Sequence, residues 1–268
     1  MLIIVLFEKI LVSVLVVLVL SWIAENVNPR ISGILSGMPL GAVLVLYFVG
    51  RELGPEFATS SSLYAIASIT GSIAFALGYY YASRLKIQYS PLISSVCGLI
   101  CFFVVAALLN WIRFDLVAAI GLTLTTLIIV AYAYHRGEAN KIQIKVKMTF
   151  QRLLFRSGLA AVFVVAITVM AQFVGPRWSG LLLGFPMTFL PFLLVIHMTY
   201  SAAQVRTIIR NFPLGLIGLL CFLVVVNQTI PEFGVNVAIV TALGCALTYL
   251  ALLSLVLSQL NYKARSYD

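Results

Sequence analysis

Long apolar runs separated by short polar segments dominate this chain of 268 residues. Most runs are close to the roughly 20 residues that a helix needs to cross a ~30 Å hydrocarbon core. No run alternates apolar and polar residues as the strands of a membrane barrel do. The pattern predicts an all-α polytopic membrane protein, because only helices satisfy their own backbone in lipid. About nine transmembrane helices are expected, at residues 2–24, 31–50, 61–83, 91–112, 116–134, 157–174, 178–200, 211–227 and 235–258.

Composition excludes a soluble domain, since 62% of the residues are hydrophobic, 9% are charged and the mean hydropathy is +1.11. The net charge of +9 is explained by basic loops facing anionic headgroups, so no nucleic-acid partner is expected. The cysteines lie inside apolar runs, and Cys97 and Cys101 are better explained as packing residues than as metal ligands. No metal and no cofactor is expected.

One short motif occurs twice, at residues 29–39 and 176–186, and both copies read Pro-Arg-x-Ser-Gly-x-Leu-x-Gly-x-Pro. Proline withholds a backbone N–H and glycine tolerates irregular backbone, so the motif predicts interrupted second and seventh helices. Two broken helices at matching places in two hydrophobic halves are typical of the binding site of a secondary transporter.

The two copies of the motif are 147 positions apart. The repeat extends beyond the motif, since Val17, Ala24 and Leu46 are each matched by an identical residue 147 positions later. Each unit then holds four helices, and the helix at 116–134 is left between them. A single intervening helix inverts the second unit relative to the first. The expected organisation is a first repeat at 1–115, a reversing helix and basic cytoplasmic linker at 116–147, and an inverted second repeat at 148–268.

The distribution of lysine and arginine predicts the orientation. With the N-terminus outside and the C-terminus in the cytoplasm, the outer side keeps only Lys9, Arg51, Arg113 and Arg177 of the 17 basic residues, a strong positive-inside bias. The basic segment 135–156 is expected to be a solvated cytoplasmic linker, with binding of anionic lipid or of a partner as the alternative. The expected location is the inner membrane of a bacterium.

Each motif runs from one face toward the bilayer centre, since Arg30 to Pro39 spans about 13 Å of helix. Unwound backbone there can offer carbonyls to a cation, and a restarted helix can offer N–H groups to an anion. The alternative is close helix packing, for which Ser-Gly-x-x-x-Gly is also typical. The candidate binding residues are Ser32, Gly33, Ser36, Gly37 and Pro39 with the first motif, and Ser179, Gly180, Gly184, Pro186 and Thr188 with the second.

No carboxylate lies deep in any predicted helix, which favours uniport, exchange or sodium coupling over proton coupling through a carboxylate. Glu8 and Lys9 could pair with each other or extend to the interface. His197 is expected at the interface or bonded to backbone rather than in a proton relay. The clustered acids, bases and nucleophiles of an intramembrane enzyme are absent from the sequence, so no catalytic residue and no enzymatic activity is expected.

The second motif, with Ser179-Gly180-Leu181-Leu182 leading to Phe185-Pro186 and a later His197, resembles the small bacterial inner-membrane proteins called GlpM-like. Those proteins are single units of about four helices, and this chain resembles two such units fused through a reversing helix. The first copy departs from the pattern, with Met38-Pro39 for Phe-Pro and Gly50 where His197 falls. The resemblance implies a membrane protein and names no substrate.

Two functions remain in view. The first is a secondary transporter that moves a small solute by alternating access, through a site at the bilayer midplane between the two motifs. The second is a non-transporting integral component of an envelope or lipid-handling complex. The expected partners are a small-molecule solute and membrane lipids, while a sodium ion and a second copy of the chain are left open.

Overall fold

The computed structural model describes residues 7–16, 18, 39–85, 89–135 and 149–265. Over these residues the chain is helical and contains no strand. A helical stretch at 7–16 comes first. The helices that follow are α3 (Leu40–Leu53), α4 (Pro55–Ala82), α5 (Ser90–Asn110), α6 (Leu116–His135), α7 (Phe150–Leu183), α8 (Phe189–Thr199) and α9 (Ala202–Arg265). The all-helical prediction is confirmed for the described residues.

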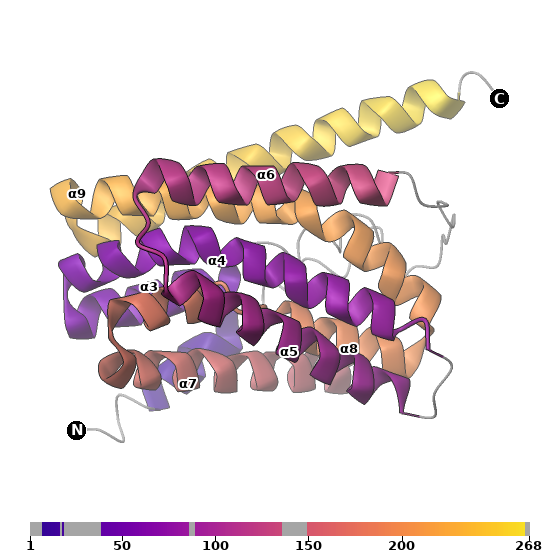
Figure 1. Ribbon diagram of the computed structural model, residues 1–268, viewed down its shortest axis with the longest axis horizontal. Coiled ribbons are helices and arrows are strands. Elements are labelled where there is room, and N and C mark those ends of the chain that lie inside the picture. Colours follow the sequence, from indigo (N-terminus) through magenta and orange to yellow (C-terminus); the bar gives the residue numbers. More distant parts are fainter. Residues whose placement is uncertain (1–6, 17, 19–38, 86–88, 136–148, 266–268) are drawn as a thin grey trace.

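Two of these helices are bent at a glycine. In α7 the glycine is Gly175, with φ 75° and ψ 174°, and in α9 it is Gly234, with φ 76° and ψ 172°. Gly54, with φ 93°, connects α3 to α4 in a similar conformation. Side chains rarely tolerate this positive-φ region, so glycine is required at all three sharp changes of direction. Figure 1 shows the result, in which α7 and α9 each double back along the bundle.

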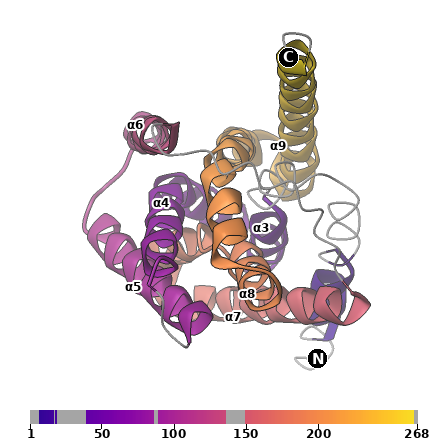
Figure 2. The same ribbon diagram turned by 90° about the vertical axis from the view of Figure 1, so that its right-hand side faces the viewer.

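Helix α4 lies near the middle of the bundle and contacts α3, α5, α6, α7 and α9 (Figure 2). Small residues allow these close approaches. Gly71 faces Phe102 of α5, and Gly98 of α5 faces Phe75 of α4. The Thr123 hydroxyl of α6 donates to the Ile66 carbonyl at 2.7 Å, which ties α6 to the same central helix.

The outward faces of the bundle are apolar. Side chains such as Trp111 and Val117 are 87% and 79% exposed, and further apolar side chains line the outer faces of α5, α6 and the end of α9. Five of the described helices are long and apolar enough to cross a membrane. Exposed apolar faces of this extent are stable only against lipid or protein.

Three predicted helix starts are wrong. Each of these helices begins earlier in the chain, in polar residues that the apolar pattern does not include. Helix α4 begins at Pro55 rather than 61, and α9 begins at Ala202 rather than 211. Helix α7 begins at Phe150 rather than 157, so the end of the predicted basic linker is helical. Arg156 in that turn is 4% exposed, and its guanidinium lies 4.6 Å from the ring centre of Phe192. It is therefore not a solvated linker residue.

The bundle has two ends, marked by Glu52 and by Arg84. The Glu52 end is where α3 ends and α4 begins, and the Arg84 end is where α4 ends and α9 begins.

Candidate functional site

The chain breaks its helical path between α7 and α8, at the second motif. Helix α7 ends at Leu183 and α8 begins at Phe189, so the predicted interruption is present here. Pro186 has no N–H to continue the ladder. A tight turn interrupts the helical hydrogen bonds at this point, and in it the Met187 N–H donates to the Phe185 carbonyl at 2.7 Å. The first motif lies outside the described residues except for Pro39, which precedes α3.

Two serines of α4 satisfy carbonyls at the end of the broken helix. The Ser68 hydroxyl donates to the Leu181 carbonyl, and the Ser72 hydroxyl donates to the Gly184 carbonyl. Both bonds are buried, where an unsatisfied carbonyl would be costly. The sequence analysis missed these serines. Their spacing of four residues, which places both on one helix face, is the signal that could have found them.

A cavity of about 30 Å³ lies at the break. A single water needs roughly 10–15 Å³ by the same measure, so the cavity has room for one or two waters or a small ion. Ser72 and Thr188 are the lining residues that carry hydroxyls, and most other lining side chains are apolar. The lining residues are Pro39, Gly41, Ala42, Ser72, Leu183, Gly184, Phe185, Pro186, Met187, Thr188, Phe189, Phe212, Leu216 and Leu219.

The cavity brings together four of the candidate binding residues, namely Pro39, Gly184, Pro186 and Thr188. Two others do not line it. Ser179 is fully buried, and Gly180 packs against α4, where an added Cβ would lie 2.7 Å from the Cβ of Tyr64. Packing is therefore the role that the structure gives Gly180. The remaining candidates, Ser32, Gly33, Ser36 and Gly37, lie outside the described residues.

Aromatic rings fill the space from the cavity toward the Arg84 end. Phe189 and Phe212 stack with ring centres 3.7 Å apart and planes 4° from parallel. Phe75 contacts Phe189 and Tyr79 at 6.4 and 6.0 Å between ring centres. The Tyr79 hydroxyl lies 3.1 Å from Nδ1 of His197. His197 is 9% exposed, so its ring is a buried partner of a tyrosine side chain rather than of the backbone.

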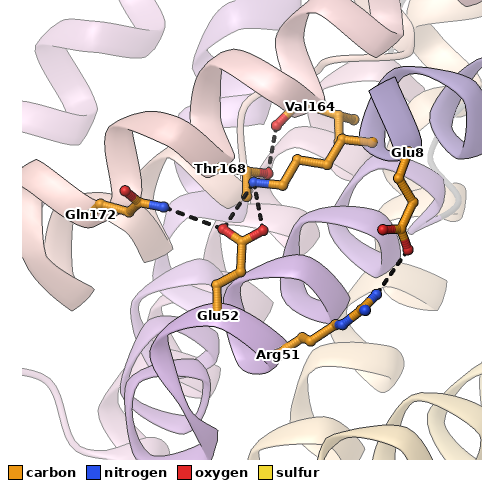
Figure 3. A network of polar contacts seen from close by, with 7 residues as sticks. Glu8, Arg51, Glu52, Val164, Thr168 and Gln172 are labelled. Carbon is orange, nitrogen blue, oxygen red and sulfur yellow. Dashed lines mark hydrogen bonds and ion pairs between the residues drawn. The ribbon is translucent and has the colours of Figure 1, made fainter. Parts of the chain in front are cut away.

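Charged residues pair at the Glu52 end (Figure 3). The Lys9 ammonium lies 2.8 Å from Oε1 of Glu52, with the Lys9 side chain 3% exposed and that of Glu52 22% exposed. Gln172 of α7 donates to the same carboxylate at 3.3 Å. Glu8 and Arg51 form a second, exposed pair at 2.8 Å. Glu8 and Lys9 therefore do not pair with each other, because helix α3 places an arginine and a glutamate against them.

The described fold is that of a helical protein whose long apolar helices suggest insertion in a membrane. Within the described residues, no group of three or more His, Cys, Asp or Glu side chains is placed to hold a metal ion. No family model, curated protein or solved structure matches the chain.

Proposed function

We propose that the protein is a secondary transporter of a small solute, and that the cavity at the broken helix is its midplane binding site. The main supporting observation is a small cavity lined by a serine and a threonine, located where a helix is interrupted inside an apolar bundle. Along α4, Ser72 lies about 25 Å from Pro55 and about 15 Å from Ala82. The cavity is therefore far from both ends of the bundle, as a midplane site requires.

Two inverted four-helix repeats, joined by α6, form the proposed architecture of nine spans. When they are shifted by the 147 residues between the motifs, α3 falls on α8, α4 falls on the part of α9 before Gly234, and α5 falls inside the part after Gly234. The resemblance to GlpM-like units, which have about four helices each, agrees with this division. An inverted pair of units supplies the two equivalent conformations that alternating access needs.

The proposed location is a bacterial inner membrane, with the N-terminus outside and the Arg84 end in the cytoplasm. The support is the distribution of basic residues, since Arg84, Arg206 and Arg210 gather at that end.

Two barriers would close the site in turn. The stacked Phe189 and Phe212 close the cavity toward the Arg84 end. Toward the Glu52 end, Glu52 of α3 pairs with Lys9 about 20 Å along the helix from Pro39. An ion pair and an aromatic stack can each separate without unfolding a helix, which suits a gate. Uniport, exchange and sodium coupling through the Ser72 and Thr188 oxygens all fit the site.

Replacement of Thr188 by valine is the proposed test. Valine keeps the shape of threonine but removes the hydroxyl, so solute flux into proteoliposomes is expected to fall about tenfold or more, by loss of one hydrogen bond to the solute. Flux of radiolabelled anions, cations and small metabolites is measured in parallel to find the solute. The matched control is Thr126→Val, because the Thr126 hydroxyl bonds the Leu122 carbonyl of its own helix, at 2.8 Å, away from the cavity.

The second candidate function is a non-transporting component of an envelope or lipid-handling complex. The observation that favours it is the tight packing of Gly180 against α4, since a packed motif needs no solute. Absence of flux for every solute in the panel, from a folded protein, would support this alternative.

A further inference from the structure

Three arginines converge at the Arg84 end of the bundle. Arg84 is the second residue after the end of α4, and Arg206 and Arg210 lie one turn apart near the start of α9. The Arg206 guanidinium donates to the Ser83 carbonyl at 3.2 Å. The end of α4 and the start of α9 are therefore joined through cationic side chains.

Arg84 and Arg210 meet at a single neutral oxygen. Nη2 of each guanidinium donates to the hydroxyl oxygen of Tyr80, at 3.0 Å for Arg84 and 3.1 Å for Arg210. Both guanidiniums also lie near the Tyr80 ring, with their central carbons 4.9 and 5.9 Å from its centre. Tyr80 is 4% exposed, so packing holds its phenol ring in place. Arginine stays protonated, and the neutral phenol accepts a hydrogen bond from each guanidinium.

The carboxylates of the described residues lie at the opposite end. Glu52 and Glu56 flank the junction of α3 and α4, and Glu8 pairs with Arg51 there.

The other two carboxylates of the described residues also lie at the Glu52 end. Glu232 lies beside the bend at Gly234, where Val235 packs on Gly50 of α3. Asp115 follows Phe114, whose ring contacts Tyr64 in the first half of α4. Within the described part of the chain, Arg84 and Arg206 have no carboxylate at ion-pair distance.

We propose that the Arg84 end binds a phosphate-type oxyanion between Arg84, Arg206 and Arg210. The planar guanidinium matches such an oxyanion with two parallel N–H donors. Tyr80 holds the guanidiniums of Arg84 and Arg210 close together, so an oxyanion beside its hydroxyl would be attracted to both. The phosphate is either a free anion or the headgroup of an anionic phospholipid, and the recognition chemistry is the same for both. This site does not depend on whether the cavity transports a solute.

Calorimetric titration of the detergent-purified protein with inorganic phosphate tests the free anion. The double variant Arg84→Gln/Arg210→Gln is expected to weaken binding about 30-fold or more, since it removes two charge-assisted contacts. The variant Arg84→Lys/Arg210→Lys keeps both charges but not the paired N–H donors. Its affinity for phosphate is expected to lie between those of the wild-type protein and the glutamine double variant. Arg113→Gln is the control for loss of positive charge at the other end, because this exposed arginine lies two residues before Asp115; it removes one charge, whereas the double variant removes two.

Nanodiscs that contain phosphatidylglycerol and phosphatidylcholine test the lipid headgroup. The amount of phosphatidylglycerol that stays bound after extraction is measured by mass spectrometry for the same variants. Loss of phosphate binding in the glutamine double variant assigns a free anion, and selective loss of phosphatidylglycerol assigns a lipid. The proposal is overturned if the wild-type protein binds neither, or if Arg113→Gln weakens binding as much as the double variant does. A melting curve for each variant separates loss of the site from loss of the fold.

Discussion

Gly184→Ala is expected to destabilise the protein by about 2–3 kcal/mol, the cost of overpacking a tight contact. An added Cβ at Gly184 would lie 2.6 Å from the Cβ of Ser68 and 2.9 Å from its carbonyl carbon. The carbonyl carbon belongs to the backbone of α4 and cannot rotate away. The methyl group would therefore push the broken helix off α4 and weaken the bonds from Ser68 and Ser72. The apparent melting temperature in detergent is the measurement.

Gly180→Ala is expected to act in the same way, since its Cβ would also meet α4, at Ser61 and Tyr64. Gly158→Ala is the matched control, because nothing lies within 4 Å of the Cβ that it adds. Alanine in a helix is otherwise favourable relative to glycine. Equal melting temperatures of the Gly184→Ala and Gly158→Ala variants would contradict the close contact between Gly184 and α4.

Glu52→Gln is expected to cost about 3 kcal/mol of stability, because it leaves the Lys9 ammonium buried without a counter-charge. The Lys9 side chain is 3% exposed, so water cannot readily replace the lost carboxylate. Lys9→Met/Glu52→Gln removes both charges and is expected to recover much of the loss. The four melting temperatures of the double-mutant cycle measure the coupling between the two side chains.

Glu8→Gln is the control for this cycle, since it makes the same chemical change in the exposed pair with Arg51. The side chains of that pair are 57% and 41% exposed for Arg51 and Glu8, so its loss is expected to change stability by less than about 1 kcal/mol. If Glu52→Gln is as harmless as Glu8→Gln, the Lys9–Glu52 pair is not an essential part of the Glu52 end.

Apolar runs and glycine–proline pairs were enough to predict an all-helical protein and a break near Gly184. Both signals are local, because hydrophobicity and missing backbone donors act within a few residues. Helix ends that depend on distant partners were not predictable in this way. The first turns of α9 carry Arg206 and Arg210, whose partners Ser83 and Tyr80 lie more than a hundred residues earlier in the chain.

The candidate site was predictable only in part for the same reason. Gly184, Pro186 and Thr188 line the cavity and belong to the motif or its surroundings. Phe212 and Leu216 join them from α9, which no periodicity of a single segment could indicate. Ser68 and Ser72 were hidden because hydroxyls inside helices usually bond their own backbone, whereas these two bond the broken helix.

Alternating access through the cavity is most directly tested by labelling a cysteine at Ala42 from each side of the membrane. Ala42 lines the cavity and is 4% exposed. The background has Cys97, Cys101, Cys221 and Cys245 replaced by alanine. Ala160→Cys is the control, since Ala160 is fully buried and does not line the cavity.

The reagent is a small membrane-impermeant methanethiosulfonate, added to right-side-out vesicles and, separately, to inverted vesicles. Alternating access predicts that Ala42→Cys reacts from both sides and that Ala160→Cys reacts from neither. Failure of Ala42→Cys to react from one or both sides would contradict the proposal that this cavity opens to each face in turn.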